Sequence, residues 1–374
     1  MSWSELRAER VLRELRGLTD EPLSPLELLT AAAESFDEAV PSDASCWSTF
    51  DPATTMVTSA IGRNIDEQGA AAARFFELEY ALDTPGQYGQ LASEGRATSL
   101  RTIDDLSVTD TGHAAVHEHL VDMGVGQELR VLFQHQDAGW GGVGLMRAPT
   151  SAGFSPDELD FATRIAPIVT AAIRGALVRA AFPQVALDLD GGPAVLIVSG
   201  DSIVEATPSA VAWLDQLHRG DRGHGEVPTA IRAVAAHATA GRTVAQRARV
   251  AASWIVLRGA PLGPDRAVVT VEPAGPPEVT SIIAAALGLT GRELDVVTAV
   301  LQGRSTKQIA GDLHLSPYTV QDHLKSVFGK AGVNSRRELV ADVFFGVYAP
   351  RLGQPVGVDG FFEGSGDSNP PLER

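Results

Sequence analysis

The chain has 374 residues, of which 44% are hydrophobic and 21% charged, and its formal net charge is −17. This length exceeds what one hydrophobic core usually organises, so we expect two or three domains. The composition is typical of a soluble globular protein and excludes a fibrous or wholly disordered chain. Cys46 is the single cysteine. It excludes an internal disulfide and a zinc cluster built from cysteines of one chain.

Charged residues interrupt the segments that could enter a membrane. The first 20 residues carry Arg and Glu throughout, so they lack the apolar run of a signal peptide. The most apolar helical segment, 164–182, contains Arg164, Arg174 and Arg179, which argues against a membrane span. We therefore expect a cytoplasmic protein with no membrane contact.

The first region, residues 1–180, alternates helical and strand patterns. Its elements are predicted in this order: amphipathic helices over 5–18 and 25–39, two strands within 44–61, a hairpin within 126–149, and a long helix beginning at Ser155. This order resembles a GAF-type sensory domain. The resemblance implies a cavity between sheet and helices that holds a small-molecule effector.

The sequence does not name that effector or any cofactor. Cys46 and Trp47, adjacent on the first predicted strand, are our candidates for contacting the ligand, and a buried, inert thiol is the alternative for Cys46. His113 and His117 stand one helical turn apart, as a metal pair would, with His119 close by. Because a complete ligand set is missing, we favour surface histidines and predict no metal site.

The second region, residues 183–277, is predicted as strand, strand, helix, helix and then further strands. This order resembles a PAS-type module. A Pro/Gly-rich segment follows it, and we assign 278–288 to a linker. The end of the chain, 350–374, has the composition of a disordered tail.

Residues 289–349 carry unusually clear helix signals. A hydroxyl residue followed three positions later by Glu or Gln is a capping box, which satisfies the free N–H groups of a helix start. The pattern occurs at Thr290, Ser305 and Ser335, while Ser316 precedes Pro317 in the favoured first-turn position. Glycines at 303 and 332 are suited to helix ends. We predict four helices, at about 290–302, 305–313, 316–331 and 335–345.

The third of these helices has two distinct sides. Its apolar stripe consists of Val320, Leu324, Val327 and Phe328, and the opposite side is polar. Only His-Leu-Ser separates it from the second helix, a connection typical of a helix-turn-helix. A plain four-helix bundle with a solvated face is the alternative from pattern alone.

The whole segment "LTGRELDVVTAVLQGRSTKQIAGDLHLSPYTVQDHLKSVFGKAGVNSRRELV" is similar to the DNA-binding domain of LuxR-type (NarL/FixJ-type) transcriptional regulators. That family places its third helix in the major groove of double-stranded DNA. The resemblance implies three sets of functional residues. On the polar side of the third helix are Tyr318, Gln321, Asp322 and Lys325, of which the last three would read bases; near phosphates are Thr306, Lys307, Thr319, Lys330 and Arg336; and on the fourth helix, for pairing of two copies, are Leu339, Val343 and Phe344. The alternatives are that Thr319 only holds the helix start and that the fourth helix packs on the chain's own N-terminal domains.

Charge supports this assignment and also limits it. Residues 289–349 have a net charge of +1, and all three lysines of the chain fall within 307–330. Family members commonly carry Lys where Gln321 stands, and Asp322 would repel phosphate. We therefore predict weak non-specific affinity and reliance on dimerisation or on particular bases.

The complete prediction is a multidomain chain with α+β GAF-like and PAS-like modules followed by an all-α four-helix LuxR-type helix-turn-helix domain. It would act as a sequence-specific, homodimeric transcriptional regulator and not as an enzyme, with the front modules sensing a small molecule or partner. One alternative is a module whose helix-turn-helix contacts protein. Another is an enzyme acting in the GAF-like cavity, for which the sequence offers no cluster of acid and base groups.

Overall fold

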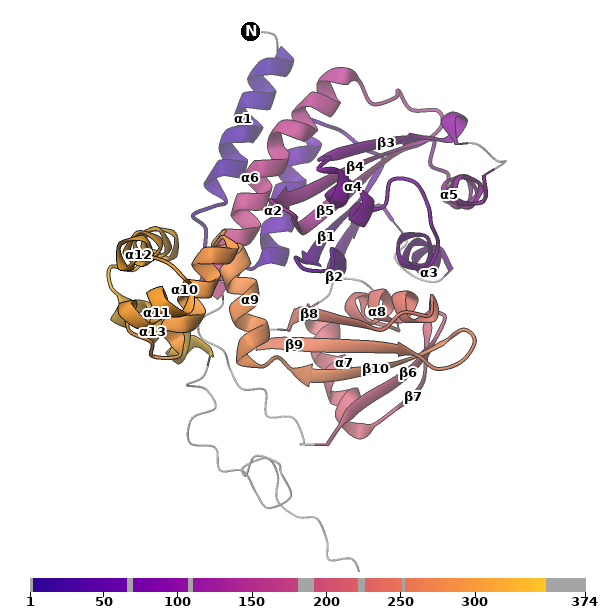
Figure 1. Ribbon diagram of the computed structural model, residues 1–374. Coiled ribbons are helices and arrows are strands. Elements are labelled where there is room, and N and C mark those ends of the chain that lie inside the picture. The colour runs from indigo at the N-terminus through magenta and orange to yellow at the C-terminus, as the bar shows by residue number, and fades with distance from the viewer. Residues whose placement is uncertain are drawn as a thin grey trace, which may run out of the picture.

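The computed structural model describes residues 3–65, 70–106, 110–180, 192–220, 226–250 and 253–347. Two five-stranded antiparallel sheets come first along the chain, and a compact group of helices follows them (Figure 1). The N-terminal two-thirds is thus α+β and the C-terminal part is helical.

The first sheet has the strand order β2-β1-β5-β4-β3. β4 and β5 form the expected hairpin, with Gln136 in the left-handed conformation at its turn. β1 lies at the centre of the buried core, where Trp47 stacks on Phe133. The strands are β1 (Ala44–Asp51), β2 (Met56–Arg63), β3 (Thr98–Thr102), β4 (Gln127–His135) and β5 (Ala138–Arg147).

Helices cover both faces of this sheet (Figure 1). On one face α2 and α6 pack against the strands, with α1 beside them, and on the other lie α3, α4 and α5. The bounds are α1 (Trp3–Gly17), α2 (Pro25–Asp37), α3 (Ala70–Phe76), a π-helical turn η1 (Glu77–Ala81), α4 (Tyr88–Glu94), a 3₁₀ turn η2 (Ile103–Asp105), α5 (Thr111–Asp122) and α6 (Pro156–Ala180). The helices, strands, hairpin and long closing helix predicted for this region are present in the predicted order.

The long helix α6 belongs to the core. Within it, Pro156–Arg179 is long and apolar enough to cross a membrane by length and composition, yet 56% of the most apolar window is buried inside the fold. Ile165, Val169 and Ile173 form its buried stripe, and α1, α2 and α9 pack around it. Its apolar composition is therefore explained by packing within the protein.

The second sheet repeats the strand order of the first, as β7-β6-β10-β9-β8. Its strands are β6 (Ala194–Ser199), β7 (Ser202–Ala206), β8 (Val244–Val250), β9 (Ser253–Pro261) and β10 (Arg266–Pro273). Two helices, α7 (Pro208–Gly220) and α8 (Thr229–Thr239), pack on it. α8 also contacts β2 and η1, so it lies between the two sheets (Figure 1).

Polar contacts fasten the two sheets together. The backbone N–H of Arg247 donates to Asp51 Oδ2 at 2.7 Å, and the Arg247 guanidinium also binds the Asp51 carboxylate. The Gln246 amide donates to the carbonyl of Val57 at 2.7 Å. Because Asp51 and Gln246 are almost fully buried, these bonds fix how β8 sits against β1 and β2.

The segment 278–288, which we expected to be a linker, is mostly helical. Helix α9 spans Pro276–Ala286, with prolines in its first turn. Proline fits the first turn of a helix because no N–H is required there, so the Pro/Gly signal marks a helix start. Val279 and Ile282 are buried, and α9 packs against α6 and α13. This helical connection replaces the predicted linker.

The helices that follow begin and end within about two residues of their predicted positions. The Thr290 and Ser305 capping boxes are both complete. At Ser335 the side chain caps Glu338 N, whereas the Glu338 carboxylate accepts from Asn334 N instead. The helices are α10 (Gly291–Leu301), α11 (Thr306–Asp312), α12 (Pro317–Ala331) and α13 (Arg336–Val347). The predicted tail, 350–374, lies outside the described residues.

Candidate nucleic-acid interface and ligand cavity

Helix α12 is held by its apolar side and leaves its polar side in solvent. Val320, Leu324 and Val327 are buried against α10 and α11. On the opposite side, Tyr318 is 73% exposed. Gln321, Asp322 and Lys325 are likewise exposed. The four residues predicted to face bases therefore share one accessible surface, which we call the α12 polar face.

The turn between α11 and α12 fixes the direction of that face. Leu315 N donates to Ala310 O at 2.9 Å, and His314 adopts a left-handed conformation with φ of +55°. Ser316 then caps α12 by accepting from Thr319 N at 3.0 Å. The Thr319 hydroxyl lies 2.9 Å from the Ser316 hydroxyl, so Thr319 also takes part in the helix start.

A buried carboxylate joins α12 to α10. Glu293, 4% exposed, accepts from Lys330 Nζ at 2.6 Å and from Ser326 Oγ at 2.6 Å. Burial alone would raise the pKa of Glu293, but hydrogen bonds from Lys330, Ser326 and Thr290 hold it at about 2. Lys330 Nζ also donates to Gly288 O at 2.9 Å. Lys330, predicted to contact phosphate, is thus occupied within the protein.

The other predicted phosphate contacts differ in availability. Arg336 donates to the backbone carbonyl of Arg304. Thr306 is half-buried at the start of α11, whereas Lys307 is exposed. Within the described residues, Lys307 and Lys325 have no ion pair. Among the basic residues predicted to contact DNA, these two lysines are therefore the most accessible to an external anion.

The residues predicted for pairing lie on α13. Leu339 is 4% exposed and belongs to the chain's own core, where α13 contacts α9, α10 and α12. It is not at the surface in this arrangement. Val343 and Phe344 also lie within α13, but their side chains fall outside the described part of the structure.

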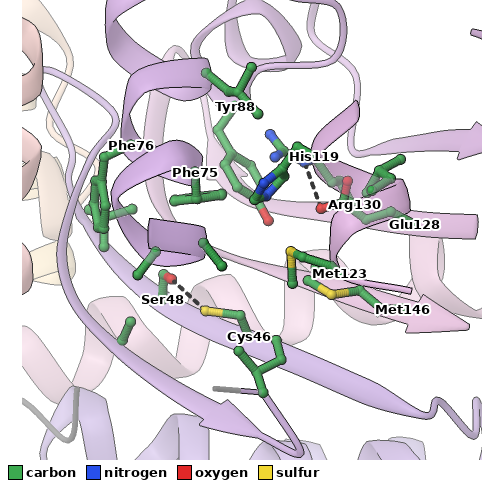
Figure 2. Close-up of a pocket in the computed structure, with 18 of the residues that line it drawn as sticks. Cys46, Ser48, Phe75, Phe76, Tyr88, His119, Met123, Glu128, Arg130 and Met146 are labelled. Carbon is green, nitrogen blue, oxygen red and sulfur yellow. Dashed lines mark hydrogen bonds and ion pairs between the residues drawn. The ribbon is translucent and has the colours of Figure 1, made fainter. Parts of the chain in front are cut away.

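A cavity of about 90 Å³ lies between the first sheet and α3–α5, and we call it the first-sheet cavity. Figure 2 shows Phe75 and Phe76 of α3 on one side of it and Met123 and Met146 on the other. Cys46 contributes to the wall, 3.9 Å from the Ser48 hydroxyl. Since successive residues of a strand point to opposite faces, Trp47 points instead into the core under α2 and α6, where it is fully buried.

A closed network of buried charges borders this cavity. Glu128 accepts from the guanidinium of Arg101 and, at 3.1 Å, from Arg130 Nε. Arg130 donates in turn to Glu79 Oε2 at 2.6 Å. Burial would raise the pKa of Glu128, but the two guanidinium groups hold it at about 2. Two cations and two anions balance each other, so the network carries no net charge.

Neutral polar groups complete the wall. Tyr88 lies under the Arg130 guanidinium, and burial raises the pKa of its hydroxyl well above the ordinary range. His119 is 7% exposed, and burial lowers the pKa of its imidazole. His119 is therefore not the surface histidine that we expected: a polar helix pattern does not reveal which of three close histidines turns toward a sheet.

No short-range pattern in the sequence reveals the charged network. Its partners are 27 and 51 residues apart for Arg101–Glu128 and Arg130–Glu79. One signal was available, because Glu128 and Arg130 interrupt an otherwise apolar strand. Charged side chains in such a strand are rarely buried unless they are paired.

Comparison with known proteins assigns the helical region. Residues 287–342 match the family "Bacterial regulatory proteins, luxR family". The spore germination protein GerE of Bacillus subtilis is 36% identical over 55 residues, which are 15% of this chain and 74% of that protein. The nitrate/nitrite response regulator protein NarP of Escherichia coli is 48% identical over 48 residues, 13% of this chain and 22% of NarP. The chain belongs to the LuxR family of bacterial regulatory proteins.

Other related proteins are matched over a smaller share of their length or at lower sequence identity. An HTH-type transcriptional regulator of Mycobacterium tuberculosis is 46% identical over 67 residues, 18% of this chain, and the chain spans only 7% of that protein. Among solved structures, the phycoerythrobilin-bound GAF domain of a cyanobacterial phytochrome has 17% identity and a TM-score of 0.33, over 45% of this chain and 95% of that one.

Proposed function

We propose that the chain is a cytoplasmic, non-enzymatic transcriptional regulator that binds double-stranded DNA through the α12 polar face. The exposure of this face, with the opposite side of α12 in the core, carries the proposal. Gln321 pairs well with adenine and Asp322 accepts from cytosine, so both suit base reading. Lys325 and Tyr318 flank them on the same side.

Phosphate contacts in this proposal come from Lys307, Thr306 and Thr319 at the starts of α11 and α12. Lys330 and Arg336 have internal partners at present. To contact phosphate, Lys330 must leave Glu293 and Arg336 must leave the Arg304 carbonyl. While these contacts remain, the two side chains position α12 and α13. Few free cations mean few neutralised phosphates, in line with the acidity of the whole chain.

The front of the molecule regulates in this proposal. Residues 1–180 form a GAF-like sensory domain and 183–277 a PAS-like domain, α9 connects them to the helix-turn-helix domain 289–349, and two copies pair on DNA. Because Leu339 is buried and α13 packs on α9 in this arrangement, pairing through α13 that uses Leu339 requires this helix to be released. A signal that favours the released state shifts the population toward DNA binding.

The first-sheet cavity is the proposed sensory site. On its wall, Arg101 and Arg130 pair with Glu128, and Arg232 lies 2.6 Å from Asp201 outside the cavity. Its volume of about 90 Å³ is well below that of a drug-sized site. A small, neutral and largely apolar effector suits it. Cys46, Tyr88 and His119 supply the polar contacts in this proposal, whereas Trp47, on the other side of β1, supports the wall from behind.

The test begins with selection of bound sequences from a pool of random 30-base-pair duplexes, followed by fluorescence anisotropy on the enriched sequence. We expect Lys325→Ala to weaken binding roughly tenfold, the value of one good base contact. Lys307→Ala should weaken enriched and random duplexes equally. Arg266→Ala, an exposed cation on β10, is the matched control and should bind as the wild type does.

Salt dependence gives an independent measure. The slope of log affinity against log salt is about −0.9 for each phosphate neutralised, so we expect a shallow slope. A slope corresponding to ten or more contacts would contradict the proposed interface.

Protein contact by the α12 polar face is the second candidate function. The 73% exposure of Tyr318 favours it, because exposed aromatic residues are enriched at protein interfaces. If the selection enriches no duplex, and wild type and Lys325→Ala bind random duplexes equally, the α12 polar face is assigned to a protein partner and not to DNA.

A further inference from the structure

A second cavity, of about 370 Å³, lies between the two sheets and is separate from the first-sheet cavity. We call it the inter-sheet cavity. Its walls come from β1, β2, β5, the start of α2 and one side of α6 in the first region, and from β8 and β9 in the second. The volume falls within the range of small-molecule sites, which occur preferentially between domains.

Aromatic side chains with unused hydrogen-bond donors line this cavity. Phe50, Trp140 and Trp254 belong to its wall. Trp140 is fully buried and Trp254 is 6% exposed. Neither indole N–H has an acceptor among the described residues, although a buried indole N–H usually finds one.

A positive charge on the same wall also lacks a counterpart. The Arg249 guanidinium is partly buried, and its Nε–H has no acceptor in the described part of the chain. Burial alone lowers the pKa of Arg249, with no nearby carboxylate opposing it. A partly buried charge without a counter-ion is disfavoured, so such groups are normally paired.

The two carboxylates of the wall are already in use. Asp51 binds the Arg247 guanidinium and backbone N–H. Glu27 accepts from the backbone N–H of Ser24 at 2.9 Å in the capping box of α2. Asp51 is taken by Arg247 and Glu27 is exposed at the start of α2, so among the described residues the cavity presents two indole N–H groups without acceptors and one guanidinium with no carboxylate lowering its energy.

We propose that the inter-sheet cavity binds a small aromatic carboxylate. Its anionic group pairs with Arg249, its flat apolar body lies against Trp254 and Trp140, and its oxygen atoms accept from the indole N–H groups after small adjustments of the wall. Guanidinium groups bind carboxylates through charge-assisted hydrogen bonds, and aromatic rings favour a planar partner. Because both sheets contribute to the wall, an occupant would stabilise one arrangement of the two regions.

The experiment uses the full chain without DNA, so its result is independent of the proposed DNA binding. Isothermal titration calorimetry with naphthalene-2-carboxylate is compared with its neutral isostere, naphthalene-2-carboxamide. We expect the carboxylate to bind the wild type at least roughly tenfold more tightly, as a charge-assisted pair requires. Equal affinity for the two compounds, or binding of neither, overturns the proposal.

Variants locate the site. Arg249→Gln should remove the preference for the carboxylate, whereas Arg258→Gln, an arginine that is 50% exposed on β9, should retain it. Trp254→Phe keeps the ring but removes the N–H, and should weaken the carboxylate about threefold. Ala72→Phe fills the first-sheet cavity and should leave carboxylate binding unchanged. Loss of binding in Ala72→Phe with retention in Arg249→Gln would place the probe in the first-sheet cavity and refute the proposal.

If Arg249→Gln does not fold, two measurements still test whether the inter-sheet cavity binds the carboxylate: the effect of Trp254→Phe, and the comparison of carboxylate with carboxamide on the wild type.

Discussion

The two sheets share one strand order but differ in how their buried charges are compensated. Around the first-sheet cavity, Arg101, Glu128, Arg130 and Glu79 form a closed network in which every charge has a partner. On the second sheet, Arg247 is paired across the boundary with Asp51, while its neighbour Arg249 has no carboxylate. A complete network stabilises the fold, whereas an unpaired charge beside a cavity indicates a missing partner. Mutation can separate the two cases: removing a charge from the complete network should lower the free energy of unfolding, whereas removing the unpaired charge should raise it.

The largest expected effect is in the first sheet. Glu128→Gln leaves two buried guanidinium groups without their shared carboxylate, which should lower the free energy of unfolding by about 3–5 kcal/mol. Urea denaturation measures the loss. Glu94→Gln breaks an exposed pair with Arg96 and is the matched control, with little change expected. Equal behaviour of the two variants would show that the buried network contributes no more than a surface pair.

An intermediate effect is expected in the helical region, where Glu293 is also fully partnered. Glu293→Gln should destabilise α10 and α12 by about 1.5 kcal/mol at pH 6, after allowance for solvent screening. Because the folded pKa of Glu293 is about 2, below its ordinary 4.5, its contribution is complete above pH 4.5 and declines as pH falls toward 2.

Hydrogen exchange of α10 and α12 at pH 6 and pH 3.5 measures this dependence. The difference between wild type and Glu293→Gln should shrink at the lower pH. A difference that stays constant or grows would mean that the carboxylate is not stabilised by its partners.

The smallest effect should have the opposite sign. Arg249→Met removes an uncompensated charge while keeping most of the apolar stem, so the protein should become more stable by about 1 kcal/mol. Thermal unfolding without added ligand measures the gain, with Arg258→Met as the exposed control. Destabilisation by Arg249→Met alone would indicate that Arg249 has an internal role, and the contrast between the sheets would fail.

Local signals account for what the sequence predicted well. The starts of α10, α11 and α12 each depend on residues three positions apart, such as Thr290 with Glu293. A short window of sequence contains both partners of such a bond, so the sequence could predict these helices and the turn at His314. The two-sided pattern of α12 depends only on helical periodicity, and it gave the correct buried stripe.

Long-range partners account for what the sequence did not predict. Pairing of Lys330 with Glu293, 37 residues earlier, cannot be distinguished in sequence from a lysine that awaits phosphate. The cavity walls combine residues from several elements, and Arg249 and Trp140 come to line one cavity only when the two sheets pack together. The first turn of α9 shows a third cause, since Pro276 and Pro277 are equally compatible with a linker and with a helix start.

The helical nature of α9 has a geometric consequence for the whole molecule. Each residue of an α-helix adds a rotation of about 100° and an advance of 1.5 Å. A one-residue insertion in a flexible coil would only lengthen the connection. Within α9 the same insertion would rotate the α12 polar face by about 100° relative to the two sheets. The number of residues in α9, from Pro276 to Ala286, therefore sets the direction in which the α12 polar face points.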